Sequence, residues 1–262
     1  MDCHVHVAAL NQRSLELMSL ANIRAVVSQL SLPDVHVNLA SQSIFDFADR
    51  SLAYHAWRTQ KYFIQTHVCV GVSPVGVPED WEEALRRLPD YILSHPVVAL
   101  GEVGFEPNSW TCPDLQIQEK ILRAQLDIAR DLGKTVAIHT PGADKQKWVS
   151  MYLGMIREHV LEPCRVVLDH ADPTVVGMIL DAGCYVGITV QPHRRLRPVD
   201  AAAVIMAGDH ERLLVNSDVS LQQESDCLAV PRVALELRRM GMTEAEVERV
   251  LWENPQRAYG IC

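Results

Sequence analysis

Short apolar runs alternate with longer amphipathic segments along the whole chain. The runs are rich in Val, Ile, Leu and Ala, as is typical of parallel strands that are buried on both faces. Eight of them predict strands at about 2–7, 23–28, 68–72, 97–104, 135–138, 165–168, 185–190 and 212–216. The segments between them predict helices at about 13–21, 79–94, 114–132, 144–160, 173–183, 199–207, 228–240 and 243–252. A further helix is predicted after the loop at 32–42 and ends at about residue 59.

This alternation of strands and helices predicts a parallel β/α fold. Eight predicted strands and a length of 262 residues, 48% of them hydrophobic, favour a single (β/α)8 barrel of the TIM type. No internal repeat, low-complexity tract or linker divides the sequence. We therefore expect one domain spanning residues 1–262.

Composition narrows the class of protein further. No apolar run approaches the roughly 20 residues that a membrane-spanning helix needs, so no membrane association is expected. The first residues lack the basic and apolar regions of a secretory signal, and a cytoplasmic location is expected by default. The seven cysteines are scattered and form no Cys-x-x-Cys pair, which argues against a disulfide framework and against a cysteine-based zinc site.

The net charge of −9, from 24 basic and 33 acidic residues, repels polyanions. Duplex DNA is therefore not favoured as a tightly held partner, although a local basic patch or bound metal ions can still attract phosphate. A small-molecule substrate is the preferred expectation.

Metal-ligating residue types recur where the predicted strands end. His4 and His6 lie two residues apart on the first strand, so both side chains project from the same face. The carboxyl ends of all strands of a β/α barrel converge on one mouth, where the active sites of such enzymes lie. The candidate ligands at these ends are His4, His6, Glu102, His139, His170 and Asp218.

Six such residues exceed what one ion needs, so a binuclear divalent-metal site is expected, with Glu102 as the bridging carboxylate. His4, His6 and Asp218 would hold one ion, and His139 and His170 the other. Four histidines favour zinc, whereas the oxygen ligands leave manganese or magnesium open. Two ions would activate a water molecule for hydrolysis, and Asp218 would accept its proton and pass it to the leaving group. Glu102 and Asp218 are thus the predicted catalytic residues.

Basic residues near the predicted mouth are candidates for substrate binding. Arginines in a loop are also typical of solvated surface, so the alternative is that these residues are exposed to solvent and do not contact the substrate. The loop at 32–42, which contains His36, is long and polar enough to belong to the mouth as well. The candidates for substrate binding are Lys145, His193, Arg194, Arg195 and Arg197.

The ordered set Asp2-x-His4-x-His6, Gly101-Glu102-x-Gly104, His139, His170, Asp218 and Asn254-Pro255 resembles the TatD-related hydrolases of the amidohydrolase superfamily. The resemblance spans the whole chain and implies a β/α barrel with a two-metal site built from the same six ligands. The runs around His139, His170 and Gly187-x-Thr189-Val190 are more similar to a branch of predicted TIM-barrel hydrolases that includes EboB proteins.

Three functions are compatible with these observations. The first is hydrolysis of a phosphoester, ester or amide bond in a small molecule. The second is the metal-dependent deoxyribonuclease activity that the resemblance implies for the better-known TatD branch, although Pro141 stands here where that branch usually has an Arg. The third is a barrel that retains the metal site but acts as a non-catalytic partner in a biosynthetic assembly.

Overall fold

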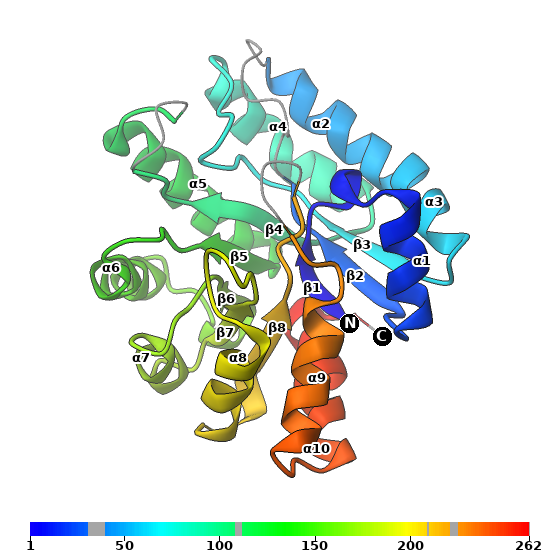
Figure 1. Ribbon diagram of the computed structural model, residues 1–262. Coiled ribbons are helices and arrows are strands. Elements are labelled where there is room, and N and C mark those ends of the chain that lie inside the picture. Colours follow the sequence, from blue (N-terminus) through cyan, green and yellow to red (C-terminus); the bar gives the residue numbers. More distant parts are fainter. Residues whose placement is uncertain (31–39, 108–111, 209, 221–224, 262) are drawn as a thin grey trace.

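The computed structural model describes residues 1–30, 40–107, 112–208, 210–220 and 225–261. Its eight parallel strands are hydrogen-bonded in sequence order and lie at the centre of the molecule, with helices around them (Figure 1). The strands are β1 Asp2–Val5, β2 Ala25–Ser28, β3 Gln65–Cys69, β4 Val97–Gly104, β5 Thr135–His139, β6 Val166–Leu168, β7 Tyr185–Thr189 and β8 Leu213–Asn216.

The first and last strands meet just beyond the end of β8. Val5 forms a parallel bridge with Val219, and the amide of His6 donates to the carbonyl of Val219 at 2.9 Å. The amide of Asp218 likewise donates to the carbonyl of His4 at 3.0 Å. These contacts bring the sheet to a nearly closed (β/α)8 barrel and confirm the predicted fold class.

Helices follow the strands around the barrel. The α-helices are α1 Gln12–Leu20, α2 Ser41–Arg50, α3 Ala56–Gln60, α4 Trp81–Ser94, α5 Leu115–Leu132, α6 Lys145–Glu158, α7 Val176–Asp181, α8 Pro198–Met206, α9 Ala229–Arg239, α10 Glu244–Glu248 and α11 Asn254–Tyr259. The described residues also form 3-10 helical segments at η1 Val7–Ala9, η3 Pro163–Arg165 and η4 His210–Arg212, and π-helical segments at η2 Ser51–His55 and η5 Arg249–Glu253. In the part of the chain that the structure describes, no helix combines the length and apolar character needed to cross a membrane.

Local sequence explains the ends of the longest helix, α5. The Asp114 carboxylate accepts from the Ile117 amide at 3.0 Å, which satisfies one of the free amides of the first turn. Gly133 ends the helix with φ 59°, a left-handed conformation that glycine adopts without steric cost. The predicted bounds 114–132 are therefore correct to one residue.

The largest differences from the predicted elements are at β3 and at the last helix. Strand β3 begins at Gln65 rather than at Val68, because its first residues are polar and partly exposed, and a hydrophobic pattern does not detect them. Val70 still bonds to β4, since its amide donates to the carbonyl of Ala99 at 3.1 Å. The last predicted helix ends at 252, and the structure has a further helix, α11, which begins at Asn254.

Alternate residues of the strands fill the barrel with small and medium side chains. Tyr259 of α11 packs into this cluster, and its hydroxyl donates to the carbonyl of Cys3 at 3.3 Å. The barrel interior is thus a packed core, and the buried polar residues His4, Glu102 and His170 lie at the mouth above it. The cluster comprises Met1, Cys3, Ala25, Val27, Cys69, Ala99, Ala137, Val167, Tyr185, Leu214, Ala258 and Tyr259.

Candidate metal centre

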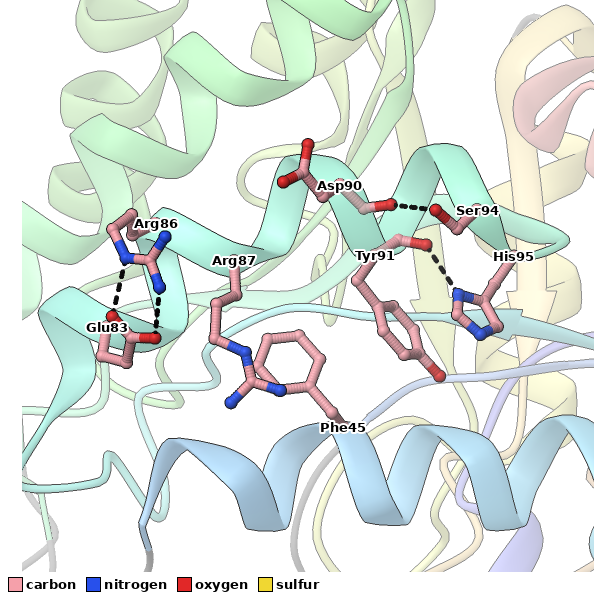
Figure 2. A pocket seen from close by; sticks show the side chains of 8 residues that line it. All are labelled: Phe45, Glu83, Arg86, Arg87, Asp90, Tyr91, Ser94 and His95. Atoms are coloured by element: carbon pink, nitrogen blue, oxygen red, sulfur yellow. Dashed lines mark hydrogen bonds and ion pairs between the residues drawn. The ribbon is translucent and has the colours of Figure 1, made fainter.

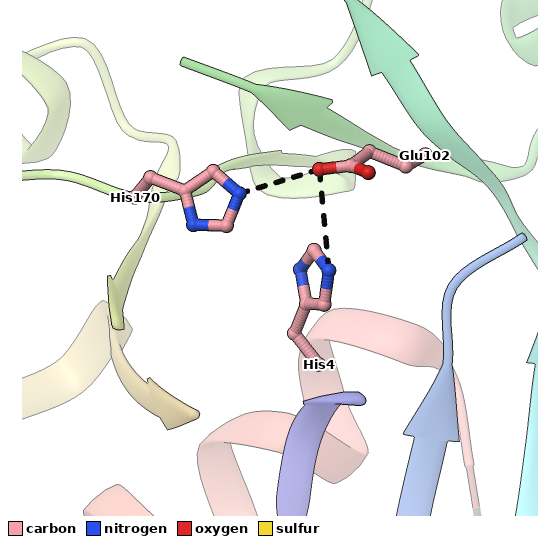
Figure 3. Close-up of side chains that lie close together, drawn as sticks. All are labelled: His4, Glu102 and His170. Carbon is pink, nitrogen blue, oxygen red and sulfur yellow. Dashed lines mark hydrogen bonds and ion pairs between the residues drawn. The ribbon is translucent and has the colours of Figure 1, made fainter. Parts of the chain in front are cut away.

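The six predicted ligands lie together at the carboxyl ends of the strands. Glu102, on β4, is 7% exposed, and its Oε1 is the point on which three histidines converge. Oε1 lies 2.8 Å from Nδ1 of His139 and 3.3 Å from Nε2 of His170. It also lies 3.9 Å from Nε2 of His4, and Figure 3 shows His4 and His170 directed at this oxygen.

Asp218 forms a second focus two residues after β8. Its Oδ1 lies 3.3 Å from Nε2 of His6 and 3.6 Å from Nε2 of His4. Two sets of three residues consequently place their ligand atoms within 4.8 Å of one another, namely His4, Glu102 and His170, and His4, His6 and Asp218. His4 belongs to both sets and links them.

His4 is oriented by a buried carboxylate. Its Nδ1 lies 2.5 Å from Oδ2 of Asp169, so Nδ1 is the nitrogen that carries the hydrogen in a neutral ring. Nε2 is buried and has no hydrogen-bond partner among the described residues. An unpartnered ring nitrogen facing two carboxylates fits a divalent cation, because histidine ligands usually have their second nitrogen held in this way.

The other two histidines near Glu102 have outer partners too. Nδ1 of His170 lies 2.7 Å from the hydroxyl of Thr189, which leaves Nε2 for Glu102. Nε2 of His139 lies 3.3 Å from Oε2 of Glu106, which leaves Nδ1 for Glu102. Each of the three rings therefore has one nitrogen held at the periphery and the other directed toward the centre.

Asp169 is itself fixed by hydrogen bonds from the adjacent residue and from β8. Its Oδ1 accepts from the amide of His170 and from Nδ2 of Asn216, both at 2.8 Å. Gly187 on β7 provides the space, since a Cβ at this position would overlap Oδ1 of Asp169. The Gly187-x-Thr189 run thus serves two histidines, His4 through Asp169 and His170 through Thr189.

Two of the candidate ligands have left-handed backbone conformations, with φ 58° at His170 and φ 47° at Asp218. Such angles are unfavourable for residues with a Cβ and are concentrated at functional sites. The strands hold them in place, since the amide of Ala171 donates to the carbonyl of Gly187 at 2.9 Å. The conformation turns both side chains from the strand direction into the mouth.

The charges of the cluster depend on one another. Burial alone would lower the pKa of His4, but Asp169, Glu102 and Asp218 raise this pKa to about 10. Burial has the same effect on His139, whose pKa is nevertheless raised to about 9 by Glu102 and Glu106. Without metal these carboxylates therefore hold protons on two imidazole rings, which is the positive charge that a divalent cation would replace.

The pKa values of the acidic groups are lowered, in contrast to those of His4 and His139. Burial would raise the pKa of Glu102, but His139, His170 and His4 hold this pKa well below its usual range. The pKa of Asp218 is also lowered against the effect of burial, mainly by the hydrogen bond with His6. Glu102 and Asp218 are thus anionic at neutral pH. Burial and the charge of Arg195 lower the pKa of His170 to about 4.

The predicted substrate-binding residues are placed differently from one another. Lys145 donates to the carbonyl of His170 at 2.6 Å and to that of Pro141 at 3.2 Å, and burial and Arg195 lower its pKa to about 8. Its ammonium group therefore supports the backbone of a candidate ligand.

The loop between β7 and α8 presents most of its basic side chains outward. His193, Arg194 and Arg197 are exposed, and Arg197 pairs with Asp200 at 2.7 Å. Arg195 is partly buried and interacts electrostatically with the carboxylates of Asp218, Asp169 and Glu102. Most of the predicted mouth loop at 32–42, including His36, lies outside the described residues.

Three further polar residues contact the candidate ligands and were not predicted from the sequence: Asp169, Thr189 and Glu106. All three satisfy the criterion that selected the candidate ligands, since each is a polar residue at or just beyond a strand end. The sequence did not reveal that they contact the candidate ligands rather than the centre of the site.

A separate groove of about 450 Å³ lies between α2 and α4 in the outer layer. Figure 2 shows the two arginines that line it: Arg86 pairs with Glu83 at 2.6 Å, and Arg87 lies over the ring of Phe45 at 4.3 Å. None of the six candidate ligands lines it, so it is part of the packing between two helices.

A (β/α)8 barrel with histidines and carboxylates gathered at its mouth defines the class of metal-dependent barrel hydrolases. The chain belongs to the TatD related DNase family, which it matches over residues 1–260. It is 28% identical to an uncharacterized metal-dependent hydrolase of Methanocaldococcus jannaschii over the full length of both chains.

Solved structures have the same fold. The TatD-like protein from Archaeoglobus fulgidus superposes with a TM-score of 0.81 at 25% identity, covering 99% of each chain. A TatD homologue from Escherichia coli has the same fold, with a TM-score of 0.72 at 18% identity, covering 100% of this chain and 98% of that one. The protein is a TatD-like metal-dependent hydrolase.

Proposed function

We propose that this hydrolase uses two divalent metal ions to cleave a phosphoester, ester or amide bond. His4, His6 and Asp218 would hold one ion, and His139 and His170 the other, with Glu102 between them. The observation that carries this proposal is the position of Glu102 Oε1, within 4 Å of ring nitrogens of His4, His139 and His170. One carboxylate surrounded by imidazoles from three strands is suited to bridging two cations.

The chemistry divides between the ions and the chain. Bound divalent ions lower the pKa of a coordinated water and polarise the bond to be cleaved. Asp218 would take up the proton of the attacking water and deliver it to the leaving group. Gln191 holds Asp218 in place, since its Nε2 donates to Oδ2 at 3.1 Å and to the main-chain carbonyl at 2.9 Å.

Zinc is the metal that we propose, with manganese or magnesium as alternatives. Four imidazoles suit a borderline ion, whereas Glu102 and Asp218 also suit harder ones. Elemental analysis of the purified protein, followed by removal of metal and reloading with each ion, tests identity and number together. Two equivalents per chain that restore turnover support the proposal, and a single equivalent that restores it fully contradicts the binuclear site.

The second candidate function is metal-dependent cleavage of DNA, which the description of the family favours. The net charge of −9 opposes tight binding of a polyanion, so we rank a small substrate first. Incubation with labelled single-stranded DNA and Mg²⁺ or Mn²⁺ separates the two, with Asp218→Asn as the control. Equal cleavage by the variant would indicate a contaminating nuclease.

A third possibility is a partner protein that binds metal without turnover. Stable co-purification of another protein, without hydrolysis of any ester or phosphate in a panel, would favour it. The presence of both predicted catalytic acids at the mouth supports an enzyme instead.

A further inference from the structure

Arg195 is set apart from the other basic residues of its loop. The amides of Arg194 and Arg195 both donate to the carbonyl of Gln191, at 3.0 and 2.7 Å, and Val190 forms a bridge with Leu196. The loop is therefore a tight turn with a defined shape. Because the side chain of Gln191 bonds Asp218, this turn is fixed directly to a predicted catalytic acid.

Arg195 lies on the loop that follows the carboxyl end of β7, at the mouth of the barrel, and the residue is partly buried there. It interacts electrostatically with Asp218, Asp169 and Glu102, which come from three different strand ends. Among the described residues, no hydrogen bond or ion pair of its guanidinium accompanies these longer-range interactions. Its donors are therefore available, although the side chain is partly buried.

The neighbouring cations cannot serve in the same way. Arg197 is committed to Asp200, at 2.7 and 2.8 Å, and Lys145 is committed to two main-chain carbonyls. Arg194 is exposed to solvent. A planar guanidinium matches phosphate or carboxylate through two parallel hydrogen bonds, and burial strengthens such a contact.

We propose that Arg195 binds an oxyanion of the substrate, so that the enzyme selects substrates that carry a phosphate or carboxylate at or beside the bond to be cleaved. This inference rests on the proposed function and narrows its substrate class. Arg195 would act as a binding and specificity residue, distinct from the residues that hold metal.

The test compares the metal-loaded wild type with Arg195→Gln, Arg195→Lys and the control Arg194→Gln. Inorganic phosphate and acetate serve as probes in calorimetric titrations, which require no turnover. Arg195→Gln should weaken binding of at least one probe by about ten- to hundredfold, as expected for loss of hydrogen bonds to a charged group. Arg195→Lys should recover part of the affinity, and Arg194→Gln should match the wild type.

Kinetics give a second readout. With 4-nitrophenyl phosphate or mono-4-nitrophenyl succinate, Arg195→Gln should raise KM by a similar factor, while neutral 4-nitrophenyl acetate should be little affected. A response to phosphate alone identifies phosphoesters as the substrate class, and a response to acetate alone identifies esters or amides that carry a carboxylate.

The proposal is overturned if neither probe binds the wild type at millimolar concentration, or if Arg195→Gln binds both as the wild type does. An equal loss on charged and neutral esters would also overturn it, since that is the behaviour of a structural residue. If no ester is cleaved but the probes still distinguish Arg195→Gln, the proposed hydrolytic reaction fails and the anion site stands. Should Arg195→Gln not fold, Arg195→Lys against Arg194→Gln decides the question.

Discussion

Asp169 Oδ2 lies 2.5 Å from Nδ1 of His4, and this contact decides which nitrogen of His4 faces the site. The other nitrogen, Nε2, lies 3.9 Å from Glu102 and 3.6 Å from Asp218. Because His4 belongs to both candidate ligand sets, a single outer carboxylate controls the geometry of the whole cluster. The position of Asp169 thus matters although it does not itself face the centre.

Replacement of Asp169 by Asn should weaken metal binding by about ten- to hundredfold, the usual cost of losing the outer partner of a histidine ligand. Excess metal should restore most of the turnover, because the ligands themselves remain. Metal affinity is measured by competition with a chelator, and the exposed Asp181→Asn serves as control. Unchanged affinity in Asp169→Asn would show that His4 needs no orientation or binds no metal.

Replacement of Glu102 by Gln should remove metal and activity together. The Gln side chain lacks the negative charge that His139, His170 and His4 face. Metal content should therefore fall by at least one equivalent per chain. Turnover should fall by more than about a hundredfold, a larger loss than that expected for Asp169→Asn. The control is Glu253→Gln, which changes an exposed carboxylate on η5. Full metal content in Glu102→Gln, measured by elemental analysis, would exclude Glu102 as a ligand.

Metal affinity should rise with pH. His4 and His139 have pKa values of about 10 and about 9 in the metal-free protein, so below these values a cation must displace their protons. Each displaced proton lowers the affinity by about tenfold per unit of falling pH. Calorimetry of metal binding in buffers of different ionisation enthalpy measures the protons released. An affinity that does not change between pH 7 and 8.5 would contradict this prediction.

The metal-free protein should show the opposite trend in stability. A histidine whose pKa is raised on folding contributes stability that is complete below its unfolded pKa of about 6.5 and is lost as the pH rises through the folded value. For His139 and His4 these folded values are about 9 and about 10. The urea midpoint of the metal-free protein should therefore fall between pH 6.5 and 9. Replacement of His139 by Gln should reduce this dependence, and an unchanged slope would contradict the assignment.

Periodicity predicted the barrel because its strands are buried on both faces and its helices are amphipathic. It missed the start of β3, where Gln65, Thr66 and His67 form strand hydrogen bonds without the burial that marks the other strands. The clustering of the candidate ligands was predictable for a topological reason: in a parallel barrel every carboxyl end reaches the same mouth. For His4, Glu102 and Asp218, the position near a strand end was sufficient to predict that they lie at the mouth.

The roles of the remaining polar residues were not predictable in this way. Asp169 and His170 are adjacent in sequence, yet one contacts His4 from outside and the other faces Glu102. The difference arises from the left-handed backbone at His170 and from the space above Gly187, neither of which is visible in a hydrophobic pattern. Arg195 likewise differs from Arg194 only through the turn that begins at Gln191.

Asn254 links the last helix to the barrel, and its replacement by Ala should destabilise the fold without emptying the metal site. Nδ2 of this buried residue donates to the carbonyls of His210 and Leu213, at 2.6 and 2.9 Å. Without it, buried acceptors lose their partner, at a cost of about 2 to 3 kcal/mol in the free energy of unfolding. Urea unfolding at fixed metal concentration measures the loss, because bound metal itself adds stability.

The control Gln256→Ala, on the same helix, should change the free energy of unfolding by less than about 0.5 kcal/mol. If Asn254→Ala instead lost metal at unchanged stability, the closing helix would belong to the functional site rather than to the scaffold.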